Sequence, residues 1–203
     1  ISPDFIFVIG LSQIISKEIL NLAKKYSIGF HPTPLPQHRG RAAIPWQILL
    51  NIRNSKVTLF KLDERMDSGD IIYQYPYEIE ETDYAKDVYD KVCNAMRKAL
   101  NCCVSSIYDE TVEFISQNHE EATYLLARRP EDGKIDWNNT GKEIETLIRA
   151  TSKPYPGAFT YYKDRKVVFW RARLESNNKY IGIPGQIAWI NENGEVGIIT
   201  KDC

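Results

Sequence analysis

The stretch PDFIFVIGLSQIISKEILNLAKKYSIGFH, residues 3–31, decides the fold of the N-terminal half. Residues 3–10 form a continuous apolar run ending in glycine, which is typical of a strand buried on both faces. Residues 16–26 follow, with Ser16 as a candidate N-cap and an apolar stripe at helical spacing. Residues 27–31 form a second short apolar run. Strand, helix and strand at this spacing predict a βαβ unit with parallel strands.

The next segment, HPTPLPQHRGR at residues 31–41, is predicted to be an irregular loop. Three alternating prolines each restrict their own backbone and that of the preceding residue. A stiff loop after the carboxyl end of a parallel strand is where α/β enzymes place their sites. Beyond it, the pattern predicts a helix over 42–50 and two paired strands over 57–63 and 70–79.

The rest of the chain changes character near residue 120. Apolar residues at helical spacing predict a long helix over 83–108, and residues 109–123 weaken into a polar linker. After one further helix, alternating apolar residues around Asn193–Gly194 predict β-hairpins. We therefore expect an α/β, Rossmann-like parallel-sheet domain over 1–115 and a small OB-like β-barrel domain over 124–203. Because a strand begins almost at Ile1, the first domain is expected to be N-terminally incomplete.

Composition excludes several classes of protein. The net charge of −1 gives no electrostatic case for a dedicated nucleic-acid binder. No apolar stretch approaches the roughly 20 residues needed to span a bilayer, and the N-terminal run lacks the basic flank of a signal peptide. The four cysteines have no metal-ligand spacing, which predicts reduced thiols, no metal site and a cytoplasmic location. Cys93 and Cys102 fall in the apolar pattern of the long helix and are expected near the core.

Three features carry candidate chemistry: His31 before the proline-rich loop, Asp67 in ERMDSGD, and the loop GLSQII at residues 10–15. In a parallel sheet all three would lie at the same carboxyl edge, around one crevice. Two structural interpretations compete with this one. A histidine before proline often has only a structural role, and an aspartate before Ser-Gly is a common turn former.

The segment GFHPTPLPQHRGRAAIPW resembles the N-x-H-P-S-x-L-P-x-x-R-G loop of 10-formyltetrahydrofolate-dependent formyltransferases. MDSGDII looks like the D-x-G-D-I element of that family, and RRPEDGKIDW and RATSKPYPGAFTYY look like its second domain. The similarity covers nearly the whole chain. It is closest to members that formylate UDP-4-amino-4-deoxy-arabinose and related amino sugars, and weaker to methionyl-tRNA formyltransferase.

This resemblance implies site residues and a reaction. His31 matches the family's catalytic histidine, which stabilises charge on the formyl oxygen, and Asp67 matches the catalytic aspartate, which orients the imidazole and helps remove the amine proton. The implied cofactor-binding residues are Gln13, Ile14, Ile15, Asp63 and Met66, and the implied substrate-binding residues are Thr33, Arg39, Gly40 and Arg41. The co-substrate would be 10-formyltetrahydrofolate, and no metal is required.

One position departs from the family pattern. The asparagine two residues before the histidine, which helps hold the formyl oxygen, is Gly29 here. Loss of an oxyanion donor typically costs about 10²–10³ in rate, so a backbone N–H, Gln37, His38 or a water would have to replace it. Three interpretations stay open: an amino-sugar nucleotide formyltransferase, a methionyl-tRNA formyltransferase acting on initiator tRNA, and a catalytically silent folate- or nucleotide-binding homologue. A homo-oligomer also stays open.

Overall fold

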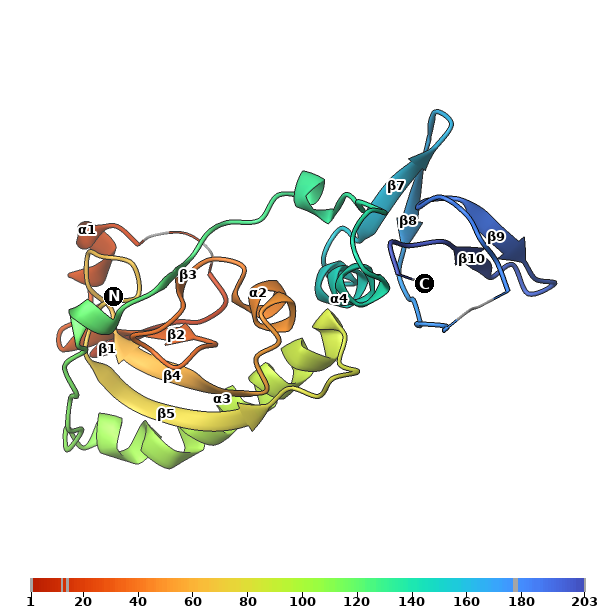
Figure 1. Cartoon of the computed structure of the whole chain (residues 1–203). Coiled ribbons are helices and arrows are strands. Elements are labelled where there is room, and N and C mark those ends of the chain that lie inside the picture. Colours follow the sequence, from red (N-terminus) through yellow and green to blue (C-terminus); the bar gives the residue numbers. More distant parts are fainter. Residues whose placement is uncertain (1, 12, 14, 177–178, 203) are drawn as a thin grey trace. The chain divides into compact units, whose positions relative to one another are not determined.

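The computed structural model describes residues 2–11, 13, 15–176 and 179–202, and the chain folds as two compact units (Figure 1). Unit 1 comprises Ile1–Glu81 and Asp87–Arg128, and unit 2 comprises Thr82–Lys86 and Arg129–Cys203. Each unit has its own secondary structure and is described separately.

A four-stranded sheet forms the centre of unit 1, in the order β1-β2-β4-β5. β1 and β2 are parallel and are connected through the short helix α1, which confirms the predicted βαβ unit. β4 pairs antiparallel with both β2 and β5, so the sheet is mixed rather than wholly parallel. The bounds are β1 Phe5–Val8, α1 Lys17–Leu20, β2 Tyr26–His31, β4 Asn54–Lys61 and β5 Ile71–Glu78.

The antiparallel direction of β4 contradicts the expectation that His31 and Asp67 both follow the carboxyl ends of parallel strands. His31, at the carboxyl end of β2, pairs with Thr58, whereas Lys61, at the carboxyl end of β4, pairs with Ile28 further back along β2. The end of β4 therefore lies away from the edge that His31 occupies, and the prediction from parallel strands is wrong for Asp67. The loop over residues 62–70 has to fold back along the sheet to bring Asp67 to His31.

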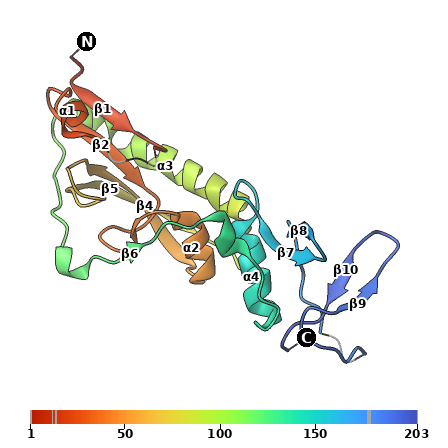
Figure 2. The same cartoon turned by 90° about the horizontal axis from the view of Figure 1, so that it is seen from above.

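The long helix α3 (Ala85–Tyr108) runs along one face of the sheet from Asp87 onward (Figures 1 and 2). Its buried side chains recur three to four residues apart, as Val88, Val92, Ala95, Ala99, Cys103 and Ile107. This register corrects one expectation, because Cys102 is exposed and its neighbour Cys103 is buried. The second helix of the unit, α2 (Ala43–Leu49), buries five of its seven residues.

Burial of Cys103 has a measurable consequence for the stability of the protein. Burial, with a smaller contribution from the charge of Cys102, raises the pKa of the Cys103 thiol to about 11, from about 9. The folded state then holds the thiol proton more tightly than the unfolded chain, so this stabilisation is complete below pH 9 and is lost between pH 9 and pH 11. We expect the free energy of unfolding to fall by about 1–2 kcal/mol across that window.

Urea unfolding of the wild type at pH 8 and pH 10.5 measures this difference. Cys103→Ala should flatten the dependence, and Cys102→Ala, which removes only the smaller contribution to the pKa of Cys103, should leave most of it in place. An equal dependence in both variants would contradict the assignment to Cys103.

The segment expected to be a polar linker is built into unit 1. Residues 124 and 125 form the strand β6 (Tyr124–Leu125), which pairs in parallel with β3 (Arg39–Gly40). Further backbone hydrogen bonds run from Arg39 N to Thr123 O (2.9 Å) and between Ile71 and Ile115 in both directions. Polar composition predicted the absence of a long element here, but it did not predict these pairings, because the partners are 44 positions away for Ile115 and 85 for Tyr124.

Unit 2 is rich in strands, in agreement with the predicted small β domain. It contains the helix α4 (Gly141–Thr151), which begins at a capping box formed by Thr140 and Glu143. In the part that the structure describes, the strands form two antiparallel hairpins, β7 with β8 and β9 with β10. Their bounds, with those of the short 3₁₀ turns η1 and η2, are β7 Ala158–Tyr162, β8 Arg165–Phe169, β9 Ile187–Ile190, β10 Val196–Ile198, η1 His119–Glu121 (in unit 1) and η2 Pro130–Gly133.

Candidate functional site

His31 is the last residue of β2, and its side chain is buried. The ring Nε2 lies 2.8 Å from the carbonyl oxygen of His38. A carbonyl oxygen only accepts hydrogen bonds, so Nε2 must carry a hydrogen and donate it. In the neutral ring, Nδ1 then has a free lone pair. The fold therefore selects one tautomer and leaves Nδ1 as the atom available for chemistry.

Asp67 faces this available nitrogen. Its Oδ2 lies 3.6 Å from His31 Nδ1, slightly beyond direct hydrogen-bond distance, and accepts a hydrogen bond of 2.7 Å from the backbone N–H of Gly40. Asp67 itself has a φ of 49°, in the left-handed region that aspartate tolerates better than most residues. A proton on Nδ1 would be held between the imidazole and the carboxylate, so the pair is suited to accepting and stabilising one positive charge.

Two glycines bring the loops this close. A Cβ at Gly69 would lie 1.8 Å from the carbonyl oxygen of Lys61, and one at Gly40 would lie 2.3 Å from that of Leu125. Both obstacles are backbone atoms, which cannot rotate away. Gly69 lets the loop after β4 fold back on its own strand, and Gly40 lets the N–H that binds Asp67 approach β6.

Gly29 lies on the same face of β2 as His31, because side chains two residues apart on a strand point the same way. A Cβ there would meet Leu62 Cδ2 at 2.6 Å and Phe60 Cζ at 2.8 Å. The space in which the family's asparagine would project is therefore occupied by two apolar side chains of this protein.

His38 places a second imidazole beside His31. Its Nδ1 is buried and has no hydrogen-bond partner among the described residues. Burial lowers the pKa of His38, and the nearby charge of His31 lowers it further, so this ring is neutral near pH 7. An unpartnered buried nitrogen at this position makes His38 a candidate to contact a reacting group, as one of the replacements considered for the absent asparagine.

The side chains expected to bind the acceptor divide into two groups. Thr33 and Arg39 are buried, at 0% and 2% exposure, and all their recorded hydrogen bonds are internal. They hold the loop in place as the structure stands. Arg41 is exposed and Gly40 half-buried, so these two remain accessible from outside.

The side chains expected to bind the folate surround the same region only in part. Gln13 is exposed, Ile15 is half-buried, and Ile14 lies outside the described residues. Asp63 and Met66 are both exposed on the loop that carries Asp67, and the Asp63 carboxylate accepts the one hydroxyl hydrogen of Ser68, whose Oγ lies 2.8 Å from each carboxylate oxygen. Asp63 thus stabilises the conformation of the loop that carries Asp67, and its exposed carboxylate remains accessible to a ligand.

Gln117 is a residue of the site region that sequence reasoning missed. It is 6% exposed, and its side-chain amide donates to the backbone oxygens of Asp67 (3.0 Å) and Gly69 (2.6 Å). The sequence around it, SQNHEEAT, reads only as a polar linker. No local pattern marks one polar side chain in such a segment as buried.

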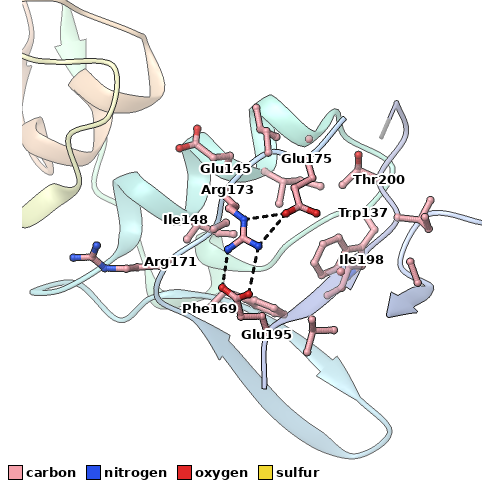
Figure 3. A pocket seen from close by; sticks show the side chains of 18 of the residues that line it. Trp137, Glu145, Ile148, Phe169, Arg171, Arg173, Glu175, Glu195, Ile198 and Thr200 are labelled. Carbon is pink, nitrogen blue, oxygen red and sulfur yellow. Dashed lines mark hydrogen bonds and ion pairs between the residues drawn. The ribbon is translucent and has the colours of Figure 1, made fainter. Parts of the chain in front are cut away.

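A hollow of about 670 Å³ lies within unit 2 (Figure 3). Its walls include Trp137, Ile148, Phe169 and Ile198, and the Arg173 guanidinium at its rim binds the carboxylates of Glu175 and Glu195. Arg173 is thereby neutralised, and the hollow shows no pairing of an acid with a base comparable to His31 and Asp67. The candidate for catalysis therefore stays in unit 1.

No group of three or more His, Cys, Asp or Glu side chains among the described residues is arranged to hold a metal ion. Likewise, none of the helices in the described part of the chain is long and apolar enough to cross a membrane.

The fold and this geometry define a class: an α/β domain with a buried histidine–aspartate pair, followed by a strand-rich domain. The family described as "Formyl transferase" matches residues 1–104, and "Formyl transferase, C-terminal domain" matches residues 128–203. This chain belongs to the formyl transferase family, as the resemblance of its loop motifs predicted.

Among named relatives, the chain is 35% identical over 174 residues to the bifunctional polymyxin resistance protein ArnA of Wigglesworthia glossinidia brevipalpis. That match covers 86% of this chain, which spans about a quarter (27%) of the relative.

Three solved structures are similar in fold. HypX from Aquifex aeolicus in complex with tetrahydrofolic acid has a TM-score of 0.80 at 21% identity, covering 98% of this chain and 34% of HypX. Methionyl-tRNA formyltransferase from Clostridium thermocellum has a TM-score of 0.73 at 26% identity, covering 98% and 78%. A sugar N-formyltransferase from Shewanella sp FDAARGOS_354 has a TM-score of 0.71 at 22% identity, covering 86% and 71%.

Proposed function

We propose that this protein transfers a formyl group from 10-formyltetrahydrofolate to the primary amine of a nucleotide-linked amino sugar. The observation that carries the proposal is the buried His31 ring, fixed in one tautomer with Nδ1 facing Asp67 Oδ2 at 3.6 Å. Family membership supports formyl transfer, and the tetrahydrofolate bound to HypX supports folate as the donor. Gln13, Ile15, Asp63 and Met66 remain the proposed contacts for the donor.

The reaction requires one proton to move. The acceptor nitrogen attacks the formyl carbon, a new C–N bond forms, and the bond to the folate nitrogen breaks. The amine proton that is lost is returned to that folate nitrogen, so atoms and charge balance. His31 Nδ1 holds this proton in between, directly or through a water, because Nε2 is committed to the His38 carbonyl.

Asp67 makes this transfer favourable by stabilising the imidazolium. The same protonated Nδ1 is then the N–H of the His31 ring that can donate to the formyl oxygen as negative charge develops there, because Nε2 donates to the His38 carbonyl. His38 Nδ1, buried and unpartnered among the described residues, is the proposed second donor in place of the family's asparagine. Catalysis otherwise depends on positioning the two substrates.

The amino-sugar acceptor is favoured by the loop motif and by the 35% identity to the ArnA relative, against 26% for the methionyl-tRNA formyltransferase. The sugar N-formyltransferase of similar fold supports the same choice. The test is an assay of formyl transfer from 10-formyltetrahydrofolate to UDP-4-amino-4-deoxy-arabinose and, separately, to methionyl initiator tRNA. We expect turnover with the amino sugar. Turnover with the tRNA alone would overturn the assignment of an amino sugar as the acceptor. Folate binding without any turnover would favour a catalytically silent homologue.

One observation keeps tRNA as the second candidate acceptor. The hairpin of β7 and β8 carries Lys163 in its turn, beside Asp164, and Arg165 and Lys166 at the start of β8, all of them exposed. A cationic hairpin of this kind suits the phosphates of a nucleic acid, and binding through it would weaken steeply with salt. A charge-reversing Lys163→Glu variant should weaken tRNA binding and leave turnover of an amino sugar unchanged.

A further inference from the structure

The strongest unassigned feature is the environment of Gln117, where three segments far apart in the chain meet. The carbonyl oxygen Oε1 accepts hydrogen bonds from Arg39 Nε (3.2 Å) and Nη2 (2.6 Å). The amide Nε2 donates to Asp67 O and Gly69 O. Chemistry fixes the orientation of this amide, because a guanidinium only donates and carbonyl oxygens only accept. All the hydrogen-bonding capacity of one buried side chain is therefore used.

Arg39 holds the Gln117 side chain through its guanidinium. Its guanidinium is 2% exposed, and its recorded partners among the described residues are neutral: Gln117, Tyr124 Oη at 3.3 Å and His119 Nδ1 at 3.1 Å. A buried charge without a carboxylate is costly unless its N–H groups are well bonded. Gln117 accepts two of these hydrogen bonds. If it moved away, the buried guanidinium would lose both, which would destabilise the fold, so Arg39 holds Gln117 in place.

Gln117 binds the carbonyl oxygens of Asp67 and Gly69, which are the residues on either side of Ser68. Together with the left-handed backbone of Asp67, they set the direction in which its side chain leaves the loop. The N–H of Gly40, next to Arg39, binds Asp67 Oδ2 from the other side. Arg39–Gly40, Gln117 and the Asp67 loop thus form one connected set of bonds around the carboxylate.

We propose that Gln117 is a positioning residue that sets the Asp67 carboxylate opposite His31 Nδ1. This inference rests on the proposed function for its catalytic meaning. Gln117 touches neither substrate in this assignment, and it acts through Asp67. The segment between the two sequence domains is then part of the catalytic apparatus, although its composition marks it only as a connection.

Gln117→Glu tests the proposal on the full chain. A carboxylate keeps the acceptors for Arg39 and removes both donors to the Asp67 loop. The ion pair with Arg39 offsets part of the cost of leaving the Asp67 and Gly69 carbonyl oxygens unsatisfied, while Asp67 loses its support. We expect kcat for formyl transfer to fall about 10- to 100-fold, with KM for both substrates unchanged within about 3-fold. The imidazole ¹⁵N signals of His31, assigned by their absence in His31→Ala, should shift at Nδ1.

Ser116→Ala is the matched control. Its hydroxyl donates to Asp70 of the same loop at an exposed position, so both kcat and the His31 signals should stay as in the wild type. If Gln117→Glu does not fold, Gln117→Asn, which shortens the neutral amide by one methylene, provides the same comparison. Unchanged kcat and unchanged His31 signals in a folded Gln117 variant would overturn the positioning role. If even the wild type transfers no formyl group, the proposed function fails, while the His31 signals still decide whether Gln117 positions Asp67.

Discussion

His31→Ala should lower kcat for formyl transfer by about 10²–10⁴-fold, because it removes the group that holds the amine proton. Asp67→Asn should give a loss of similar size, since an amide keeps an acceptor for the Gly40 N–H and withdraws the negative charge that stabilises the imidazolium. The two residues act as one unit in this mechanism. The double variant should therefore be no slower than about the slower of the two single variants.

Stopped-flow or end-point assays of formyl transfer measure these rates, and circular dichroism with thermal unfolding checks that each variant is folded. Glu78→Gln is a suitable control, because it removes one exposed carboxylate from β5 and should leave kcat unchanged. Wild-type rates in a folded His31→Ala and a folded Asp67→Asn would rule out the proposed mechanism. Fully additive losses would show instead that the two side chains act independently.

Gly29→Asn should destabilise the protein by about 1–3 kcal/mol, although it restores the family's residue. Gly29 is buried, and the new Cβ would meet the ends of the Leu62 and Phe60 side chains at 2.6 and 2.8 Å, so one or both of these side chains would have to shift. Leu62→Ala removes one of these obstacles. The double variant should therefore lose less stability than the sum of the two single variants, with a favourable coupling of about 0.5–3 kcal/mol.

Urea unfolding of the wild type, both single variants and the double variant gives this coupling directly. The double variant is also the one in which an asparagine side chain has room beside His31. Because His38 is the proposed second oxyanion donor, we expect the kcat of the double variant to stay within about 3-fold of that of Leu62→Ala. Additive destabilisation would show that position 29 is not blocked by Leu62. A gain in kcat of about 10-fold or more would show that the donor is missing from the wild type and would contradict the role of His38.

Sequence patterns predicted the local elements of the fold well and the contacts between distant residues poorly. The strand within 3–10, the strand ending at His31 and a helix between them follow from periodicity within about ten residues. Their details do not, because β1 buries none of its residues, α1 spans only Lys17–Leu20, and Ser16 makes no side-chain cap hydrogen bond. The direction of β4 does not, because an isolated strand has the same composition whichever way it pairs. His31 and Asp67 could be singled out as candidates, but the prediction that they share a carboxyl edge relied on a parallel strand that is antiparallel.

The remaining features of the site required three-dimensional information. Gln117 and Arg39 are strongly polar residues that would be expected at the surface. They are buried because each satisfies the other, and no pattern within either segment encodes a partner 78 positions away. The same is true of the obstruction around Gly29, since glycine in a strand is consistent with a bulge, a close approach or simple loss of a side chain.

The parallel pair formed by β3 and β6 has a practical consequence for dissecting this protein. A fragment cut at residue 115, where the sequence alone suggests a domain boundary, would lack Gln117, Thr123 and β6, and with them the support of the loops that carry Gly40 and Asp67. Such a fragment would fail for reasons unrelated to the second domain. Chimaeras that exchange the C-terminal half with another family member should instead be joined after Arg128. A junction there keeps β6 in the same protein as β3, the strand with which it pairs.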